Sequence, residues 1–355
     1  MSRLPIALAL VAALAAAQAP AAGFVDVLDT PALPSPLAPR SLLQGIAQAG
    51  NRLVAVGQRG HVLVSRDDGR SWTQSPVPVS SDLTAVYFVD ADHGWAVGHD
   101  GVILHSDDGG ARWSVQLTGR RANELFLKAM ERRAAAEPAS AAARADLEEA
   151  KRFRDQGADK PFLDVWFADA AHGFAVGAYN MIFHTADGGC TWEPWFDRTE
   201  NPKLLNLYAI RAAAGEVYVA GESGLVMRLD PAAQRFRAVA LPYKGSLFGV
   251  AGSGNAAIVF GLRGNAFRSA DAGRTWSKVE AGLPASIVAA ARTQRGALLL
   301  ADAGGRVALS DDGGNTFARV AIQPALPLTA LAEASDGRVI AVGPRGATRT
   351  AAVPD

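Results

Sequence analysis

Three arginines at equivalent places in the chain are the side chains best suited to binding chemistry. Arg59, Arg263 and Arg345 each lie two residues after the glycine that ends an apolar run. A guanidinium is permanently charged, and its planar fork of N–H donors matches carboxylates and phosphates. Arginine is also a frequent anchor of protein interfaces. The shared position predicts a binding patch; the alternative is that three exposed arginines only solubilise the surface.

Carboxylates are the second candidate, because two of them about 5–10 Å apart can hydrolyse a glycosidic bond. Glu222 and Asp302 end comparable apolar runs, but they lie two repeats apart and the turn between them offers Leu262. Tyrosine, the nucleophile of sialidases, is scarce, at five residues. We predict no catalytic residues, and we keep a sialidase-like glycoside hydrolase or a glycan-binding lectin as the alternative function.

Metal and redox chemistry have little support in the sequence. His93 and His172 fill equivalent positions of a repeat, as do His105 and His184, so repetition explains four of the six histidines. The His-x-x-x-His spacing of zinc sites and the ligand spacing of EF-hands are both missing. The single Cys190 cannot form a disulfide within the chain. We expect neither a metal nor another cofactor.

A repeat of about 40 residues carries these side chains. Each copy has four short runs rich in β-branched and aromatic residues, separated by Gly, Asp and Asn, which is typical of a four-stranded antiparallel meander. The glycine that ends the second run recurs at Gly57, Gly98, Gly177, Gly221, Gly261 and Gly343, with Ala301 in the remaining slot. Seven such units predict an all-β fold, a seven-bladed β-propeller.

Both ends of the chain lie outside this regular pattern. The last repeat lacks a fourth run, whereas residues 24–28 form an isolated apolar run near the N-terminus. We predict that this N-terminal strand closes the last blade, since pairing removes an exposed sheet edge. Before it, residues 1–22 read as a signal peptide, with Arg3, an apolar run over residues 6–17 and small residues after it. The propeller then spans residues 23–355, and the location is periplasmic or secreted.

One insertion interrupts the repeats, between blades 2 and 3. Residues 120–160 are dominated by Ala, Leu, Glu, Lys and Arg, which favour helix. Pro138 breaks the segment, Ser140 is a cap for a second helix, and Gly157 ends it. We predict a helical hairpin with charged pairs at Glu124/Lys128 and Glu148/Arg152. Contact with a partner and decoration of the rim are both open roles.

The turn between the third and fourth runs follows the pattern Ser/Thr-x-Asp-x-Gly-x-x-aromatic. An Asp side chain accepts hydrogen bonds from turn N–H groups, and Gly supplies positive φ. We expect a structural role for the five Asp–aromatic pairs Asp67 and Trp72, Asp108 and Trp113, Asp187 and Trp192, Asp271 and Trp276, and Asp312 and Phe317. Blade 4 has lost the motif.

These turns resemble the Asp-box, or BNR, repeat, which several families share. The element His-Gly-aromatic-Ala-Val-Gly at residues 93–98 and 172–177 narrows the resemblance to the photosystem II stability/assembly factor family. That resemblance implies a non-catalytic propeller that binds a membrane protein or a membrane-associated complex. The implied client is photosystem II if the organism is photosynthetic, and an exporter is another candidate. Lys and Arg balance Asp and Glu at 35 each, so we expect no nucleic-acid partner.

In a propeller, the turns between second and third strands share one face with the crossings between blades, and ligands usually bind there. The flanking glycines repeat while the turn residues differ, as expected of a binding site carried on a repeated scaffold. The predicted partner-binding residues on this face are Arg59, His99, Asp100, Tyr179, Asn180, Glu222, Arg263 and Arg345.

Overall fold

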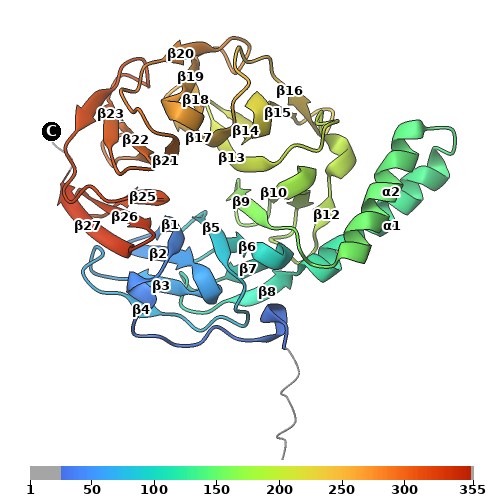
Figure 1. The fold of residues 1–355 in the computed structure, drawn as a ribbon, viewed down its shortest axis with the longest axis horizontal. Helices are drawn as coiled ribbons and strands as arrows, with labels where there is room; N and C mark the ends of the chain where they lie inside the picture. The colour runs from blue at the N-terminus through green and yellow to red at the C-terminus, as the bar shows by residue number, and fades with distance from the viewer. Residues whose placement is uncertain (1–24, 353–355) are drawn as a thin grey trace, which may run out of the picture.

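The structure, a computed structural model, describes residues 25–352. Seven small antiparallel sheets stand around a central space (Figure 1) and fit a seven-bladed β-propeller. We number them as blades 1–7 in chain order. The predicted signal peptide, residues 1–22, and Phe24 lie outside the described residues. Within the described part of the chain, neither helix is long and apolar enough to cross a membrane.

The first six blades have four strands each, hydrogen-bonded in chain order from the innermost to the outermost. Blades 1–3 comprise β1 (Leu43–Ala49), β2 (Arg52–Gly57), β3 (Val62–Ser65) and β4 (Thr73–Gln74); β5 (Leu83–Phe88), β6 (Gly94–Gly98), β7 (Ile103–Ser106) and β8 (Ser114–Leu117); and β9 (Phe162–Phe167), β10 (Gly173–Gly177), β11 (Ile182–Thr185) and β12 (Glu193–Pro194).

The remaining blades repeat this plan, except that blade 7 has three strands among the described residues. Blades 4–7 comprise β13 (Leu207–Ala213), β14 (Glu216–Gly221), β15 (Val226–Asp230) and β16 (Arg235–Ala238); β17 (Leu247–Ser253), β18 (Ala256–Gly261), β19 (Ala266–Ser269) and β20 (Ser277–Val279); β21 (Ile287–Arg292), β22 (Leu298–Asp302), β23 (Val307–Ser310) and β24 (Ala318–Val320); and β25 (Ala330–Glu333), β26 (Arg338–Gly343) and β27 (Gly346–Ala352).

The core lies between neighbouring blades. Second strands such as β6, β10 and β18 are buried along their whole length, because each sheet is covered on both faces. This explains their continuous apolar sequences. Trp95 of blade 2 stacks on Phe167 of blade 3, with ring centroids 3.4 Å apart, and Phe174 of blade 3 meets Phe236 of blade 4 edge-on at 5.4 Å. Aromatic pairs of this kind add to the free energy of apolar burial.

Side-chain hydrogen bonds hold the turns between third and fourth strands. In blade 1, the Asp67 carboxylate accepts bonds from the N–H and hydroxyl of Ser71, at 2.8 and 2.6 Å. Ser65 Oγ accepts the N–H of Gly69 at 2.8 Å. Asp108, Asp187, Asp271 and Asp312 accept the corresponding N–H in their own turns. Trp113, Trp192 and Trp276 are buried, while Trp72 and Phe317 are partly buried.

The predicted helical hairpin is present between blades 2 and 3. It consists of α1 (Gly119–Ala136) and α2 (Ala141–Gln156) (Figure 1). Ser140 Oγ accepts the N–H of Ala143, and Gly157 ends α2 at φ +84°. Phe126 and Met130 of α1 are buried, and they pack in one hydrophobic cluster with residues of blade 3. Because α1 packs on β12, the hairpin covers the outer edge of that blade.

The charged pairs on the hairpin differ from those predicted. Glu124 pairs with Arg121 rather than Lys128, and Glu148 pairs with Lys151, both three residues apart. Arg152 bonds to Glu149. Spacings of three and four residues both bring side chains together on a helix, so the sequence alone does not choose between them.

The prediction of an N-terminal strand in blade 7 is wrong for residues 25–28. Val27–Asp29 form a 3-10 turn, η1, whose first N–H groups are capped by Asp26, which accepts the N–H of Leu28 at 2.9 Å. The carbonyl of Val27 accepts the N–H of Ser80, beside blade 1, and Arg120 of α1 contacts Asp26 at 2.6 Å. These contacts provide partners for the polar groups of Asp26 and Val27 without pairing in a sheet.

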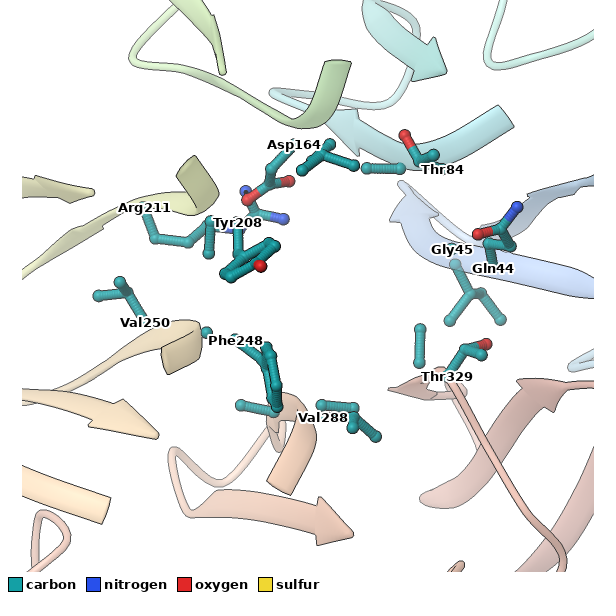
Figure 2. Close-up of a pocket in the computed structure, with 18 of the residues that line it drawn as sticks. Gln44, Gly45, Thr84, Asp164, Tyr208, Arg211, Phe248, Val250, Val288 and Thr329 are labelled. Atoms are coloured by element: carbon teal, nitrogen blue, oxygen red, sulfur yellow. Dashed lines mark hydrogen bonds and ion pairs between the residues drawn. The ribbon is translucent and has the colours of Figure 1, made fainter. Parts of the chain in front are cut away.

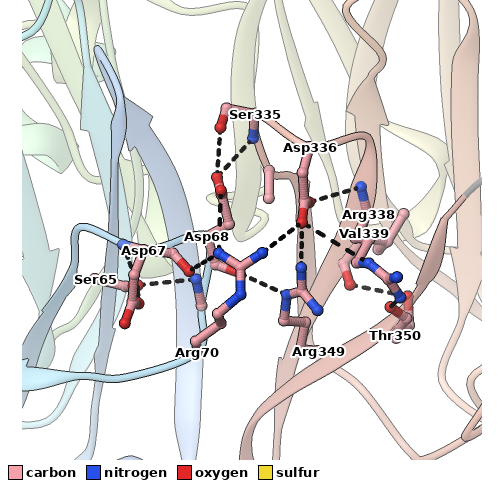
Figure 3. A network of polar contacts seen from close by, with 12 residues as sticks. Ser65, Asp67, Asp68, Arg70, Ser335, Asp336, Arg338, Val339, Arg349 and Thr350 are labelled. Atoms are coloured by element: carbon pink, nitrogen blue, oxygen red, sulfur yellow. Dashed lines mark hydrogen bonds and ion pairs between the residues drawn. The ribbon is translucent and has the colours of Figure 1, made fainter.

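Blade 7 instead meets blade 1 through side chains (Figure 3). The carboxylate of Asp68 in blade 1 accepts the N–H and hydroxyl of Ser335 at 3.0 and 2.6 Å. Asp336 in turn bonds to Arg349 of its own blade and to Arg70 of blade 1. Near the channel, the Thr329 hydroxyl donates to the Leu43 carbonyl at 2.8 Å. The first and last blades are therefore joined by polar contacts at both their inner and outer parts.

Replacing Asp67 with Asn tests the turn chemistry. The bonds from Ser71, with those from Ser65 and Arg70, lower the pKa of Asp67 to about 2. A depressed carboxyl pKa stabilises the fold above about pH 4, and this contribution is lost as pH falls through about 2. We expect Asp67→Asn to lower Tm by roughly 2–4 °C near neutral pH, with a smaller deficit near pH 2. Melting followed by circular dichroism measures both; an equal deficit at both pH values would contradict the assignment.

Candidate functional site

In six of the seven blades, a β-bulge at the start of the innermost strand places one side chain at the central channel. In blades 1–6, the first and second strands skip one residue of the first strand in their pairing, for example Gln44 between Leu43 and Gly45. A bulge leaves its extra residue unpaired and redirects the side chain. The residues at this position, blade by blade, are Gln44, Thr84, Leu163, Tyr208, Phe248, Val288 and Thr329. All seven line one cavity, and we call them the channel ring.

The cavity has a volume of about 220 Å³ and lies on the axis of the blades (Figure 2). This is smaller than the roughly 300–1,000 Å³ of typical small-molecule pockets. It has room for one large side chain or a short stretch of extended backbone. Because the bulges lie where first strands begin, the channel ring is at the end of the channel that carries the turns between second and third strands.

The channel ring is asymmetric in chemistry. Blades 3–6 contribute the apolar arc Leu163, Tyr208, Phe248 and Val288, and the other three blades contribute Gln44 and two threonines. Tyr208 and Phe248 meet edge-on, with ring centroids 5.6 Å apart. Figure 2 shows both rings beside the open cavity. This arrangement suits a peptide segment that places an apolar side chain against the apolar arc and its backbone polar groups against the polar arc.

Directly below the channel ring, an ion pair joins a buried carboxylate to a partly exposed guanidinium, and both residues line the cavity. The residue after the bulge is Gly or Ala in six blades, but it is Asp164 in blade 3. Asp164 is 5% exposed and contacts the Arg211 guanidinium of blade 4 at 2.6 Å. Its carboxylate also accepts the N–H groups of Val165 and Ile210, each at 2.9 Å. Arg211 donates as well to the carbonyls of Val165 and Ile210 and lies over the Tyr87 ring.

Burial and the ion pair act on the Asp164 carboxyl in opposite directions. Removal from water raises its pKa, and Arg211 with the two backbone N–H groups offsets part of that rise. The hydrogen bonds account for both carboxylate oxygens. With its acid and base both engaged in this way, the pair is suited to fixing the channel wall between blades 3 and 4 rather than to proton transfer.

In blades 1–5, the turns of the predicted binding face share one conformation, whereas Arg345 lies in a two-residue turn between Gly343 and Gly346 of blade 7. Arg59, Asp100, Tyr179 and Arg263 are the central residues of 3-10 turns and have φ between +52° and +57°. In three blades the N–H of this residue donates to a side chain just before the next blade's first strand: Arg59 to Asp82, Tyr179 to Asn206 and Arg263 to Ser286. In these three blades the turn backbone is thus fastened to the next blade, while the central side chain is exposed.

The predicted arginine patch is available to a partner. Arg59, Arg263 and Arg345 are exposed, and no hydrogen bond or ion pair within residues 25–352 uses their guanidinium groups. Blades 1 and 7 are neighbours, and blade 6 separates blade 7 from blade 5. His99 and Tyr179 are also exposed, and Asp100 and Glu222 are partly exposed.

Two carboxylates and one amide have structural partners. Asn180, predicted on the binding face, is 1% exposed and bonds to Phe196, Thr199 and Asn201, so it holds the loop after blade 3 and does not fit that face. Asp302 is fully buried and paired with Arg306 at 3.1 Å. Glu222 accepts the N–H of Asn206 at 3.3 Å. These partners speak against a catalytic Glu222–Asp302 pair.

The channel ring and the ion pair are the parts of the site that sequence reasoning missed. Aligning the first strands on their buried leading residue, for example Leu43, Phe162 and Leu207, would have shown the ion pair's carboxylate as an exception. In that alignment Asp164 is the only charged residue at a position otherwise held by Gly and Ala. The β-bulge itself left no mark in the sequence, because the residue it redirects ranges from Thr to Phe.

The sequence profile of the family described as "Photosynthesis system II assembly factor YCF48" matches residues 64–132 and 149–307, more than half of the chain. The chain belongs to this family. The gap between the matched segments, residues 133–148, falls within the distal part of the helical hairpin.

Two relatives of the YCF48 family match parts of the chain. The photosystem II assembly lipoprotein Ycf48 of Synechococcus sp. (strain CC9902) is 30% identical over 118 residues, which are 32% of this chain and 35% of that protein. The chloroplastic photosystem II stability/assembly factor HCF136 of Guillardia theta is 47% identical over 45 residues, 12% of this chain and 11% of that one. The matched segments therefore span about a third and a tenth of these relatives.

Solved structures extend the likeness in fold to most of the chain. YCF48 bound to a D1 peptide superposes with a TM-score of 0.61 at 15% identity, covering 89% of this chain and 94% of that one. YCF48 from Cyanidioschyzon merolae gives 0.60 at 19% identity, with coverages of 90% and 97%. The WD40 propeller domain of Doa1 gives 0.60 at 10% identity, covering 87% and 92%. These neighbours support the propeller architecture.

Replacing Arg211 with Met tests the ion pair. Removing the guanidinium leaves the buried Asp164 carboxylate uncompensated, so we expect a loss of about 3 kcal/mol in the free energy of unfolding. The pKa of Asp164 rises further in the variant, and a raised carboxyl pKa costs stability as pH increases above about 4. Urea unfolding should show a larger loss near pH 7 than near pH 5. The double variant Asp164→Asn/Arg211→Met is the control, and it should recover part of the loss; a pH-independent loss would contradict this assignment.

Proposed function

We propose that the protein is an exported, non-catalytic assembly factor that holds a segment of a membrane-protein client at the channel ring. The carrying observation is the apolar arc over blades 3–6, which opens on the same face as the unpaired guanidiniums of Arg59, Arg263 and Arg345. Apolar anchors within a charged and polar rim are typical of protein-binding surfaces. The predicted signal peptide supports a periplasmic location.

The family supports a membrane-protein client. Its named members are photosystem II assembly factors, and one solved YCF48 is bound to a D1 peptide. We therefore propose a segment of a photosystem II subunit as the client in a photosynthetic organism. An exporter is the client to test in any other. The segment binds in extended form, because the cavity volume of about 220 Å³ is smaller than that of a single turn of a helix roughly 10–12 Å across.

A closed ring of seven blades is part of this proposal. The Thr84 hydroxyl of blade 2 donates to Phe162 of blade 3, and Thr329 of blade 7 donates to Leu43 of blade 1 in the same way. The contact between the last and first blades thus repeats a contact between consecutive blades. A ring held in this way keeps the seven channel side chains at fixed positions and limits the ordering entropy that binding would cost.

The channel-ring variant Tyr208→Ser/Phe248→Ser should lose client capture. A photoreactive amino acid at position 288, next to this pair in the ring, should crosslink in intact cells to an integral membrane protein identified by mass spectrometry. Removing two aromatic anchors should reduce capture about 10- to 100-fold. Val115→Ser, at an exposed position on β8, is the matched control. Unchanged capture by the ring variant, or turnover of fluorogenic glycosides by the wild-type protein, would overturn the proposal.

Reversing the charge of the arginine patch is the second test. We expect Arg59→Glu/Arg263→Glu/Arg345→Glu to reduce capture at least tenfold, with little change in Tm because no described bond uses these guanidiniums. The matched control reverses three exposed arginines of the Asp-box turns, Arg66, Arg112 and Arg274, and so makes the same change in net charge. Equal capture by the two triple variants would remove the arginine turns from the binding surface.

A further inference from the structure

Two departures from the regular repeat meet at one place on the rim. The first is the distal part of the helical hairpin, residues 133–148, which lies between the segments that the family profile matches. The second is blade 4, whose turn between β15 and β16 has lost the Asp-box. The end of α1, the 3-10 turn η6 (Phe196–Arg198) and residues 233–235 of blade 4 together line a pocket of about 330 Å³. This pocket is separate from the channel ring, whose lining shares no residue with it.

The pocket is lined mainly by charged side chains. Arg133, Glu137, Asp197, Arg198 and Arg235 surround it, with Ala233 and Gln234 completing the wall. The two carboxylates of the pocket, Glu137 and Asp197, both contact the same arginine, Arg133. Arg133 contacts Asp197 at 3.8 Å, Glu137 at 3.5 Å and, behind the pocket, Asp146 at 2.5 Å.

The other two arginines have unused donors. The Arg198 guanidinium lies over the Trp195 ring, 4.8 Å from its centroid, and it makes no ion pair among the described residues. Arg235 Nε is buried without a hydrogen-bond partner. A buried donor without an acceptor costs free energy, and a guanidinium offers five N–H groups. The pocket is therefore lined by two guanidiniums that form no ion pair among the described residues.

The backbone holds these two arginines side by side. The segment after η6 runs next to β16, since Thr199 forms a parallel bridge with Phe236 and the N–H of Glu200 donates to the Phe236 carbonyl at 3.0 Å. Arg198 and Arg235 directly precede these paired residues. Glu200 is directed away from them, to Arg237 and the N–H of Ala238.

We propose that this rim pocket binds an oxyanion, a carboxylate or phosphate group, between Arg198 and Arg235. Two guanidiniums with free N–H donors match the oxygen pairs of such groups. The hairpin forms the opposite wall, and Arg133 keeps the neighbouring carboxylates turned toward itself. The site does not depend on the channel ring, so it stands or falls independently of the proposed function.

Thermal unfolding of the full chain in inorganic phosphate tests the proposal. At equal ionic strength, replacing chloride with phosphate should raise Tm saturably, by about 2 °C at ten times Kd. Phosphate also stabilises proteins by exclusion from their surfaces. The variant Arg198→Ala/Arg235→Ala should retain only that unsaturable part, whereas Arg112→Ala, which removes an exposed arginine elsewhere, should behave as the wild type. If the double variant does not fold, Arg198→Gln alone should still weaken phosphate binding at least threefold.

Two further probes distinguish the source of the oxyanion. Vesicles of phosphatidylglycerol, but not of phosphatidylcholine, would bind if the group is a lipid phosphate with a net charge. A short peptide with a free C-terminus, but not its amidated form, would bind if the group is a terminal carboxylate. Each result supports the site only when Arg198→Ala/Arg235→Ala abolishes it. A phosphate shift of equal size in the wild type and the double variant, or no saturable shift in the wild type, overturns the proposal.

Discussion

The close approach of the seven innermost strands is the constraint on which the rest of the structure depends. A Cβ added at Gly45 would lie 3.2 Å from the Cα of Ala85 in the next blade, tighter than ordinary packing. Small residues therefore follow the bulge in every blade but one. The bulge residue before them is redirected into the channel, where its size is not limited by the neighbouring strand. The close approach of the strands thus explains both the small residues between them and the varied side chains that line the channel.

The departures from the repeat are informative because the repeat is otherwise strict. Asp164 occupies a position reserved for Gly or Ala, and it requires Arg211 and two backbone donors to be tolerated there. The hairpin and the altered turn of blade 4 lie together on the rim, far from that pair in the fold's layout. A repeated scaffold carries new chemistry where its pattern is broken, since the unbroken positions are needed for packing.

The periodicity of the sequence predicted most of the fold. The features that it did not predict depend on contacts between residues far apart in the chain. The glycine ladder and the Asp-box turns depend on local chemistry, so residues such as Gly57 and Asp67 are readable in the sequence. The N-terminal segment was mispredicted because its apolar sequence suggests a strand. In the structure, Asp26 caps a 3-10 turn there and also contacts Arg120, which is more than 90 residues away in the chain. Asn180 looked like an exposed turn residue for a similar reason: its burial depends on the loop at residues 196–201.

Cys190 is the only cysteine of the chain, and it is exposed in the Asp-box turn of blade 3. Turns of this type lie at the opposite end of the blades from the channel ring. The protein therefore carries one natural attachment point for a thiol-reactive dye or spin label, remote from the surface assigned to the client. Such a label would report which end of the molecule faces a membrane without an engineered substitution.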